Sequence, residues 1–562
     1  MRREASVVNK KVCSFPILFA LLALLIGTCA VVFPASAQAA PTSTGSITVS
    51  GTVARSYDAY QIFDANVIDD DNDAKIATDL AWASGAARDA VLPVLHSAGM
   101  SNSQTTAQEA AEWLNTDSHL TSALSAQLAR SLQSSGAEPV ALNAGTAAEL
   151  PCGYWLIVAK DDAISQNEAG TAPVMALVGG SAVTVKPKAA TPKVAKHVLE
   201  DSTAAWQKAA DATVADDLYW RLSATVPAGL AAYDTYAVRF VDTMSAGLDP
   251  SKVAASMRVY VAAGADGGFD AVSADKDGSA GTEPAKGWTD ITAQCATKVA
   301  ADGTFTVRTG DLIAALGGAD AFIAGARVVA VYNAPLNSAC NHGIAKGNPN
   351  EVYLRYPRSP FADQSGDAGF TRTPSDDACA YTWDLALTKR GSDGDKPLAG
   401  AVLSIADDRG RTLSADGTWD AEGKATVTTG EDGRVTVSGV DSGKLEVREL
   451  KAPKGYTAFE GTRSVTVKAE GLDVDQVAAA KPKLTITAES PLRADSADGS
   501  TGSLEASLIN TPTGTPPSIT TGGFMPSTGD MAMYVAAAAA VAGAALIVVA
   551  LLVKRGGGSH KE

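Results

Sequence analysis

Histidine is scarce in this chain of 562 residues, which contains only five. None of them stands in a metalloprotease, zinc-cluster or hydrolase-elbow pattern, and the sequence carries no active-site motif for an external substrate. The acidic run 69–73 alternates carboxylates as a calcium loop does, but Ala74 stands where such a loop needs glycine and Leu80 where it needs a bidentate glutamate. We therefore predict a solvated turn there, no metal, no cofactor, and a protein that is not an enzyme.

Basic residues are outnumbered by acidic ones, with 46 Lys and Arg against 62 Asp and Glu and a net charge of -16. No stretch of the sequence gathers enough basic side chains to bind a row of phosphates, which excludes nucleic acid as a partner. An acidic surface is instead typical of a secreted protein that must stay soluble.

Long apolar runs occur at the two ends of the chain. Near the N-terminus, basic residues precede an apolar run over about 15–33, and the small residues of Ala35-Ser36-Ala37-Gln38-Ala39 follow it. This order predicts a secretory signal peptide over residues 1–39. Near the C-terminus, the uncharged run 531–553 is long enough for one transmembrane helix, and Lys554 and Arg555 mark its cytoplasmic side. We therefore expect the residues between the two runs to lie outside the cell.

Cysteine is also rare, with six in the chain, of which two leave with the signal peptide. An even number outside the cell permits disulfides, and four cysteines allow three pairings. We favour a bond between Cys295 and Cys340, because both lie within one expected domain. Cys152 and Cys379 lie in different expected domains, and we expect them to be free.

Strand patterns fill most of the remaining sequence. Alternating apolar and polar residues, rich in β-branched and aromatic types, begin at Gly45 and recur to Asn510. Residues 105–132 differ, because Ala, Leu, Gln and Trp113 recur at helical spacing. We therefore predict a mainly β protein of tandem immunoglobulin-like β-sandwich domains, with a helical insertion in the first. The expected units are the signal peptide 1–39, a first domain 40–188, a middle domain 189–375, a third domain 380–512, a linker 513–524 and a C-terminal segment 525–562.

The sequence Met525-Pro526-Ser527-Thr528-Gly529 stands directly before the C-terminal apolar run and its basic tail. It resembles the cell-wall sorting signal of Gram-positive surface proteins, with Met525 in place of the usual leucine. The resemblance implies that a sortase cysteine attacks the carbonyl carbon of Thr528, releases Gly529 onward and passes the acyl group to an amine. The apolar helix is then a transient anchor, and peptidoglycan is the final attachment.

The third domain resembles a collagen-binding B-type domain. The resemblance is carried by residues 385–389, 397–405, 445–456 and 507–511. It implies an isopeptide bond between Lys389 and Asn510, with Glu449 assisting. Such a trio suits the chemistry, because burial lowers the pKa of a lysine, raises that of a carboxylic acid, and lets the acid polarise the amide and relay protons.

The middle domain resembles that of Spa-type backbone pilins of Gram-positive bacteria over residues 192–198, 240–248 and 350–356. This resemblance implies a second isopeptide bond, between Lys196 and Asn350, assisted by Asp242. Lys193 competes with Lys196, although it faces the opposite side of the expected strand. The first domain has no lysine between 40 and 73, so its first strand supplies no matching crosslink.

The segment 183–188 at the first domain junction resembles the pilin motif, whose lysine accepts the acyl group that the sortase holds. By position this lysine is Lys188, and Lys186, which stands where the family usually has tyrosine, is the rival acceptor. The resemblance implies a shaft subunit linked head to tail to other copies through Thr528, anchored in the cell wall and supporting adhesion to a host or extracellular-matrix ligand. The alternative is a monomeric wall-anchored adhesin whose β domains form a stalk.

Overall fold

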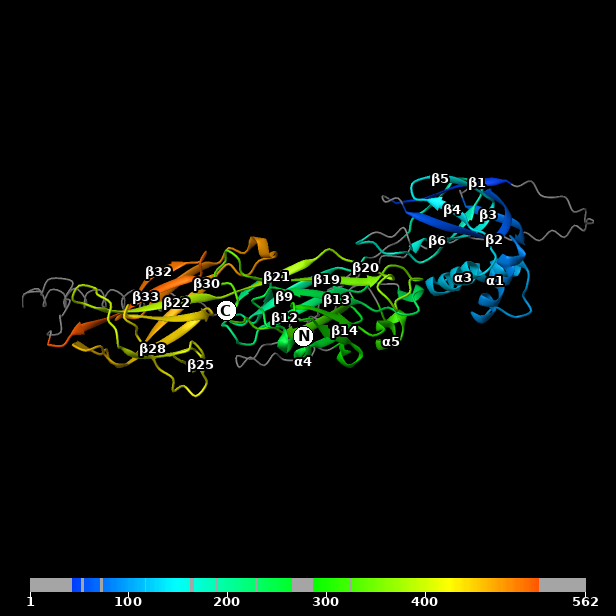
Figure 1. Cartoon of the computed structure of the whole chain (residues 1–562). Helices are drawn as coiled ribbons and strands as arrows, with labels where there is room; N and C mark the ends of the chain where they lie inside the picture. The colour runs from blue at the N-terminus through cyan, green and yellow to red at the C-terminus, as the bar shows by residue number, and fades with distance from the viewer. Residues whose placement is uncertain are drawn as a thin grey trace, which may run out of the picture.

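Strands dominate the computed structural model, which arranges them in three consecutive β-rich parts in a row (Figure 1). The structure describes residues 43–51, 55–70, 74–116, 118–161, 166–187, 191–227, 230–264, 287–322 and 326–514. The expected signal peptide and C-terminal membrane helix fall outside these ranges. Among the residues described, no helix is long and apolar enough to cross a membrane.

The first part, residues 43–187, combines two small sheets with three helices (Figure 1). The helices begin where Ser84, Thr106 and Thr121 cap them, each side chain accepting a backbone N–H of the first turn. The predicted insertion over 105–132 holds the second and third helices, whereas the first, which contains Pro93, precedes it. The elements are α1 (Gly85–Ser97), α2 (Ala107–Asn115) and α3 (Ser122–Ser134), a sheet of β1 (Thr44–Val49), β5 (Ala147–Pro151) and β8 (Val183–Val185), and a sheet of β2 (Ser56–Asp69), β3 (Lys75–Trp82), β4 (Val140–Asn143), β6 (Gly153–Ala159) and β7 (Val174–Val178).

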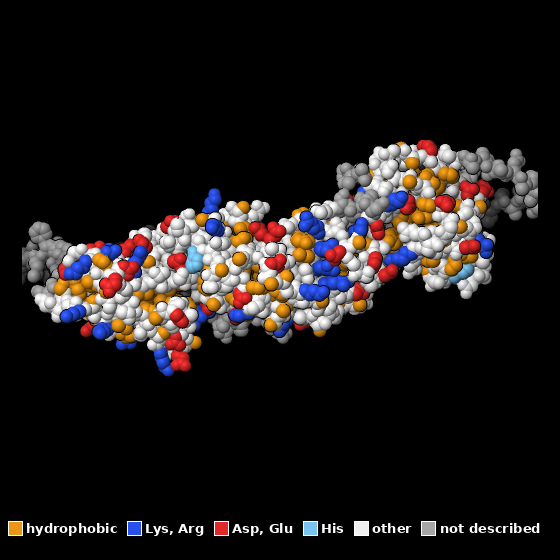
Figure 2. Space-filling view, viewed as in Figure 1, with side chains coloured by type: hydrophobic (Ala, Val, Ile, Leu, Met, Phe, Trp, Pro, Cys, Tyr) orange, Lys and Arg blue, Asp and Glu red, His pale blue; other side chains and the backbone are white. Residues whose placement is uncertain are grey.

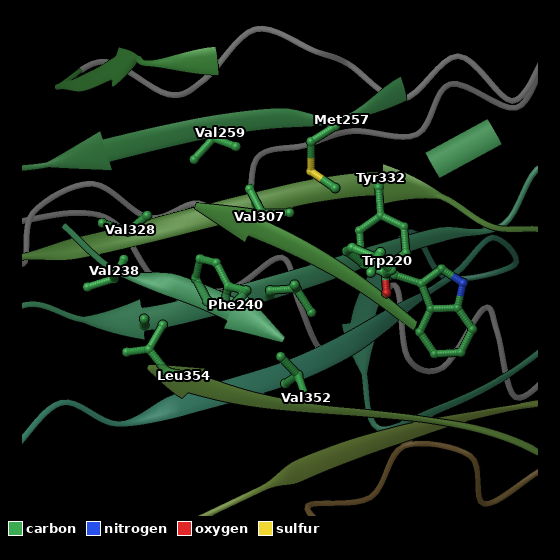
Figure 3. Close-up of a cluster of buried hydrophobic side chains, with 14 of the residues drawn as sticks. Trp220, Val238, Phe240, Met257, Val259, Val307, Val328, Tyr332, Val352 and Leu354 are labelled. Carbon is green, nitrogen blue, oxygen red and sulfur yellow. The ribbon is translucent and has the colours of Figure 1, made fainter. Parts of the chain in front are cut away.

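The middle part, residues 191–381, is a sandwich of two sheets that face each other across one apolar core. Figure 3 shows side chains of both sheets meeting in this core, with Tyr332 and Trp220 side by side at one end. One sheet has the order β10-β9-β12-β18-β14-β15 and consists of β9 (Val194–Glu200), β10 (Ala205–Gln207), β12 (Tyr219–Thr225), β14 (Arg258–Ala262), β15 (Trp288–Asp290) and β18 (Arg327–Asn333). The other has the order β11-β21-β19-β13-β17-β16, with β20 beside β19, and consists of β11 (Ala209–Asp211), β13 (Arg239–Met244), β16 (Ala296–Val299), β17 (Thr304–Arg308), β19 (Asn348–Pro357), β20 (Phe370–Arg372) and β21 (Asp376–Tyr381).

Short helical turns connect these strands. The sheet that contains β19 also extends further along the chain than the sequence predicted. Because β21 pairs with β19 and β11, the middle part continues to Tyr381, beyond the limit of 375 expected from the sequence. The turns are α4 (Val253–Ser256), α5 (Leu312–Ala315), η2 (Leu230–Ala232), η3 (Pro250–Lys252), η5 (Thr292–Gln294) and η6 (Ala319–Ala321).

The third part, residues 382–514, is also built from two sheets. Its first strand, β22, pairs in parallel with its last, β33, so that Lys389 lies opposite Leu508 and Gly391 opposite Asn510. One sheet consists of β22 (Trp383–Gly391), β27 (Arg434–Val440), β29 (Tyr456–Thr457), β32 (Leu492–Asp498) and β33 (Ser503–Pro512). The other consists of β23 (Val402–Ala406), β24 (Thr412–Leu413), β25 (Trp419–Asp420), β26 (Val427–Thr428), β28 (Gly443–Lys451), β30 (Thr462–Glu470) and β31 (Lys483–Ala488), with η7 (Val477–Ala479) between β30 and β31.

The structure does not contain the expected disulfide, because Cys295 and Cys340 are both free thiols. Cys295 stands just before β16, the outer strand of its sheet, and its Sγ donates to the Ile291 carbonyl at 3.3 Å. Cys340 lies beside the start of β19, and its Sγ is 3.7 Å from Nε2 of His342. Strands β19 and β16 are separated by β13 and β17, and three strand spacings amount to about 14 Å, twice the roughly 7 Å between Cα atoms that a disulfide can bridge. The pairing inferred from shared domain membership is therefore wrong.

Basic side chains gather on the middle part although the sequence has no basic run, and Figure 2 shows a group of Lys and Arg over this part of the molecule. Arg308, Arg239, Arg355 and Arg372 lie opposite one another on four neighbouring strands. Like charges so placed repel. The Asp367 carboxylate relieves this repulsion, since it pairs with Arg239 at 2.6 Å and with Arg355 at 2.9 Å.

Carboxylates are held close together where the middle and third parts meet. Asp211, at the end of β11, accepts hydrogen bonds from Trp383 Nε1 at 2.6 Å and from the Ser442 N–H at 2.9 Å, both in the third part. Its own N–H donates to Glu200 at 3.1 Å. Burial, and then the charge of Asp211, raises the pKa of Glu200 to about 8. The folded chain therefore favours a neutral Glu200 at this junction.

We expect the substitution Glu200→Gln to make the stability less dependent on pH. The pKa of Glu200 lies above its ordinary value of 4.5, so its contribution to stability is fully present below pH 4.5 and is lost as the pH rises through about 8. A neutral amide has no such loss, and the variant should gain up to about 1.4 kcal/mol over the parent for each pH unit between 5 and 8. Urea unfolding at several pH values measures this difference. The exposed Glu431→Gln is the control, and parallel pH profiles for parent and Glu200→Gln would contradict the prediction.

Candidate isopeptide sites

The third part brings together the three residues that the sequence predicted for it. Lys389 on β22 and Asn510 on β33 belong to one sheet, and Glu449 on β28 belongs to the facing sheet. Both carboxylate oxygens of Glu449 accept from Asn510 Nδ2, at 2.8 and 3.1 Å. Lys389 Nζ lies 3.7 Å from Oε1 of Glu449. The carboxylate is thus close to both groups of the expected bond.

Burial sets the chemistry of this cluster. Lys389, Glu449 and Asn510 are all buried, Lys389 Nζ donates to the Leu508 carbonyl at 3.1 Å, and the Phe459 N–H donates to Glu449 at 3.1 Å. Loss of water lowers the pKa of Lys389 to about 8, although the nearby Glu449 acts in the opposite direction. Neutral lysine, the form that can attack a carbonyl carbon, is therefore accessible near neutral pH.

The middle part brings its expected trio together across the two sheets. Lys196 lies on β9 of one sheet, and Asp242 and Asn350 lie on β13 and β19, which are neighbours in the other. Lys196 Nζ is in direct contact with Oδ2 of Asp242. All three side chains are completely buried, and Trp220 and Tyr332 lie beside the lysine, each ring centroid 5.5 Å from Nζ.

The ionised forms of this pair are disfavoured by burial. Desolvation lowers the pKa of Lys196 to about 8 and raises that of Asp242 to about 6, while the attraction between the two opposes each shift. The two shifts run toward each other, so moving one proton from the ammonium to the carboxylate costs less free energy than it does between the same groups in water. That transfer yields a neutral amine and a carboxylic acid side by side.

The carbonyl oxygens of both asparagines are unsatisfied. Oδ1 of Asn350 and Oδ1 of Asn510 are buried and have no hydrogen-bond partner in the part of the chain that the structure describes. Leaving such an acceptor unpaired costs about 1–3 kcal/mol. Negative charge also develops on this atom when an amine adds to the amide carbon. A half-turn of either amide exchanges Oδ1 with Nδ2, which would place the Asn510 oxygen at Glu449 and the Asn350 oxygen at the Tyr332 hydroxyl.

The two rival lysines, Lys193 and Lys186, are both exposed to solvent. Lys193 is exposed just before β9, whereas Lys196 is buried. Lys186, the rival acceptor in the first junction, is exposed just after β8. Lys188 and the sorting motif 525–529 with Thr528 lie outside the described residues, so their predicted roles rest on the sequence.

The structure adds residues that the sequence analysis did not single out. Tyr332 on β18 places its hydroxyl among the middle trio, and the only sequence signal for it was the strand pattern of that segment. Lys208 Nζ donates to the Lys196 carbonyl at 2.8 Å and contacts Asp376, whose carboxylate accepts from the Lys196 N–H at 2.6 Å. These bonds fix β9 against β21 and so hold the backbone that carries Lys196.

Comparison with solved structures gives matches at low sequence identity. The T6 backbone pilin of serotype M6 Streptococcus pyogenes is 16% identical with a TM-score of 0.45, and the match covers 84% of this chain and 98% of that one. The full-length major pilin SpaD from Corynebacterium diphtheriae is 14% identical with a TM-score of 0.40, covering 84% of this chain and 98% of that one.

Two comparisons by sequence add to these. The trypsin-resistant surface T6 protein of Streptococcus pyogenes serotype M6 is 30% identical over 143 residues, which are 24% of this chain and 24% of that protein. This chain therefore matches about a quarter of the length of that relative. The family model of the SpaA prealbumin-like fold domain matches residues 384–481, which run from β22 to just before β31 and include both Lys389 and Glu449. Residues 384–481 of this chain are therefore similar to the SpaA prealbumin-like fold domain.

Proposed function

We propose that this protein is the shaft subunit of a covalently polymerised surface pilus, with two internal Lys–Asn isopeptide bonds. The observation that carries the proposal is the repeated buried cluster of a lysine, a carboxylic acid and an asparagine, one in the middle part and one in the third. Burying a lysine together with an acid costs hydration free energy. Two such pairs, each beside an asparagine, therefore favour a chemical role for these residues. The partial similarity to the T6 surface protein supports the same reading.

The bond-forming reaction is balanced within each cluster. In the third part, Lys389 gives a proton to Glu449, and the neutral Nζ attacks Cγ of Asn510. The new C–N bond forms as the bond from Cγ to Nδ2 breaks. Glu449 passes a proton from the attacking nitrogen to the leaving one, which departs as ammonia. The protein acts on itself once, so it is not an enzyme toward other molecules.

The position of the bonds suits a load-bearing fibre. In the third part the bond joins the first strand to the last, β22 to β33, and in the middle part it joins the first strand, β9, to β19. Each closes a loop of more than about 100 residues, and a crosslink of that span stabilises by about 4 to 5 kcal/mol in the chain-entropy treatment. Under tension the crosslinked strands cannot be pulled apart, because the load passes through a covalent bond.

Assembly requires a donor and an acceptor. The donor is Thr528, whose carbonyl a sortase holds after cutting before Gly529, and the acceptor is the Lys188 amine, with Lys186 as the rival. Repetition of this step gives a head-to-tail polymer that does not close, and transfer to peptidoglycan ends it. The ligand to which such a fibre adheres belongs to the host or to its extracellular matrix.

The soluble ectodomain should weigh less than its sequence by two molecules of ammonia. Each Lys–Asn bond expels one, so one loss is assigned to Lys389 with Asn510 and one to Lys196 with Asn350. Intact-mass spectrometry measures the deficit, and tryptic peptides joined at these residues locate it. A mass equal to that of the sequence would refute both bonds.

Glu449→Ala should leave one ammonia unreleased and lower the midpoint of thermal unfolding. In the third part, Glu449 is the acid that contacts both Asn510 and Lys389, and without it the amide is not polarised and Lys389 is left buried without its carboxylate partner. Glu446→Ala, an exposed position on the same strand, is the matched control and should keep both losses. Glu449→Ala protein that still lacks two ammonia molecules would rule out this role.

Lys188→Ala should remove the ladder of high-mass polymers from cell-wall extracts while monomer remains on the wall. Sortase transfer needs an exposed amine, and Lys188 follows Pro187 in the junction between the first two parts. Thr528→Ala should remove both polymer and wall-bound monomer, because no acyl donor is left. Immunoblots of wall extracts report these products. If Lys188→Ala and the double substitution of Lys186 and Lys188 both polymerise like the parent, the shaft role fails and the monomeric adhesin becomes the better reading.

A further inference from the structure

One buried hydroxyl touches all three members of the middle cluster. Oη of Tyr332 lies 2.8 Å from Lys196 Nζ, 3.2 Å from Oδ2 of Asp242 and 2.9 Å from Nδ2 of Asn350. Tyr332 is fully buried, as are the three residues around it. Its ring packs edge to face on Phe305, with 4.8 Å between centroids, which fixes the direction of the hydroxyl.

The directions of these hydrogen bonds follow from the groups involved. The Lys196 ammonium and the Asn350 amide nitrogen can only donate, so the phenol oxygen accepts from both. The single phenol proton is then directed at the Asp242 carboxylate. Burial, and then the charge of Asp242, raises the pKa of Tyr332 well above its ordinary value, so the phenol keeps its proton.

The two clusters of this chain differ in how the acid reaches the asparagine. In the third part, Glu449 accepts directly from Asn510 Nδ2. In the middle part, the hydrogen bond that the structure describes from Asn350 Nδ2 goes to Tyr332, and Tyr332 in turn contacts Asp242. An aspartate side chain is one methylene shorter than a glutamate. The phenol thus fills the gap that the shorter acid leaves.

We propose that Tyr332 is a catalytic residue that relays the proton from Asp242 to the leaving nitrogen of Asn350 while the Lys196–Asn350 bond forms. The inference rests on the isopeptide bond proposed above. Lys196 first gives a proton to Asp242, and its neutral Nζ attacks Cγ of Asn350. As the bond from Cγ to Nδ2 breaks, the phenol donates its proton to Nδ2 and takes one from the Asp242 carboxylic acid. Asp242 receives the second proton of the attacking nitrogen, and ammonia leaves with the phenol restored.

The substitution Tyr332→Phe tests this relay, because it removes the hydroxyl and keeps the ring against Phe305. The full chain is produced under pulse labelling and digested, and the peptide joining Lys196 to Asn350 is quantified over time. We expect this crosslink to form at least tenfold more slowly in Tyr332→Phe than in the parent. The Lys389–Asn510 crosslink of the same molecules should form at the parent rate, since no tyrosine of the described part of the chain hydrogen-bonds to Lys389, Glu449 or Asn510.

A second substitution separates the relay from a loss of structure. The double variant Tyr332→Phe with Asp242→Glu should recover the crosslink, because a glutamate can reach Asn350 directly, as Glu449 reaches Asn510. Asn350→Ala, which cannot form the bond, gives the protease resistance of a folded but uncrosslinked middle part. The middle part of Tyr332→Phe should be as resistant to protease as that of Asn350→Ala. If it is less resistant, recovery of the crosslink in the double variant still tests the relay.

The outcomes distinguish the two proposals. A parent chain without the Lys196–Asn350 crosslink refutes the bond itself, and the relay falls with it. A parent that forms the bond, with Tyr332→Phe forming it equally fast, overturns the relay alone. A double variant that stays uncrosslinked also overturns the relay, because the relay requires that a longer acid can replace the hydroxyl.

Discussion

The middle and third parts both depend on burying a lysine between two sheets. An ammonium group loses several kcal/mol of hydration in such a place, and a nearby acid offsets part of this cost. Lys196 meets Asp242, and Lys389 meets Glu449, each across the interface of its sandwich. Because the acid must come from the facing sheet, the pair fixes how the two sheets stack. The registers of β9 and β13, and of β22 and β28, have to satisfy these contacts.

The same requirement has two different solutions in one chain. The longer acid of the third part spans the distance to its asparagine, and the lysine is steadied by a backbone carbonyl, that of Leu508. The shorter acid of the middle part contacts the lysine directly but leaves a space, which Tyr332 occupies. The hydroxyl comes from the sheet that also carries the lysine, so the middle site draws two groups from each sheet. The third site draws its acid from one sheet and its lysine and asparagine from the other.

Much of this could be predicted from the sequence, and the exceptions have physical causes. The alternation of apolar residues indicated the strands, and the segments around Lys389, Glu449 and Asn510 predicted one site for these residues, whose side chains the structure brings together. The tyrosine could not be found in this way, because an aromatic residue in a strand is usually part of the core and its hydroxyl contacts are set by tertiary packing. Pairing Cys295 with Cys340 failed because membership of one domain says nothing about which strands separate two residues. The first helix was not predicted, and it contains Pro93, a residue that removes one backbone hydrogen bond from a helix.

The cluster of arginines on the middle part also could not be predicted from the sequence. Four arginines that are far apart in the sequence become neighbours because β17, β13, β19 and β20 lie side by side, and Asp367 from a loop pairs with two of them. A search for basic runs cannot detect a cluster that the sheet assembles across strands. The junction of the middle and third parts is similar, since Glu200 and Asp211 meet there only through the fold.

The absence of a lysine in the first strands of the first part follows from the proposed path of the load. If Thr528 of one subunit is joined to Lys188 of the next, tension enters at the end of the third part and leaves between the first and middle parts. The middle and third parts then lie on this path, and each contains a buried cluster that can join its first strand to a later one. On this path the first part would carry no tension, and a covalent tie there would add nothing to the strength of the fibre. Its helices begin at side-chain caps and pack against an apolar core, which would suffice for a part that is not pulled.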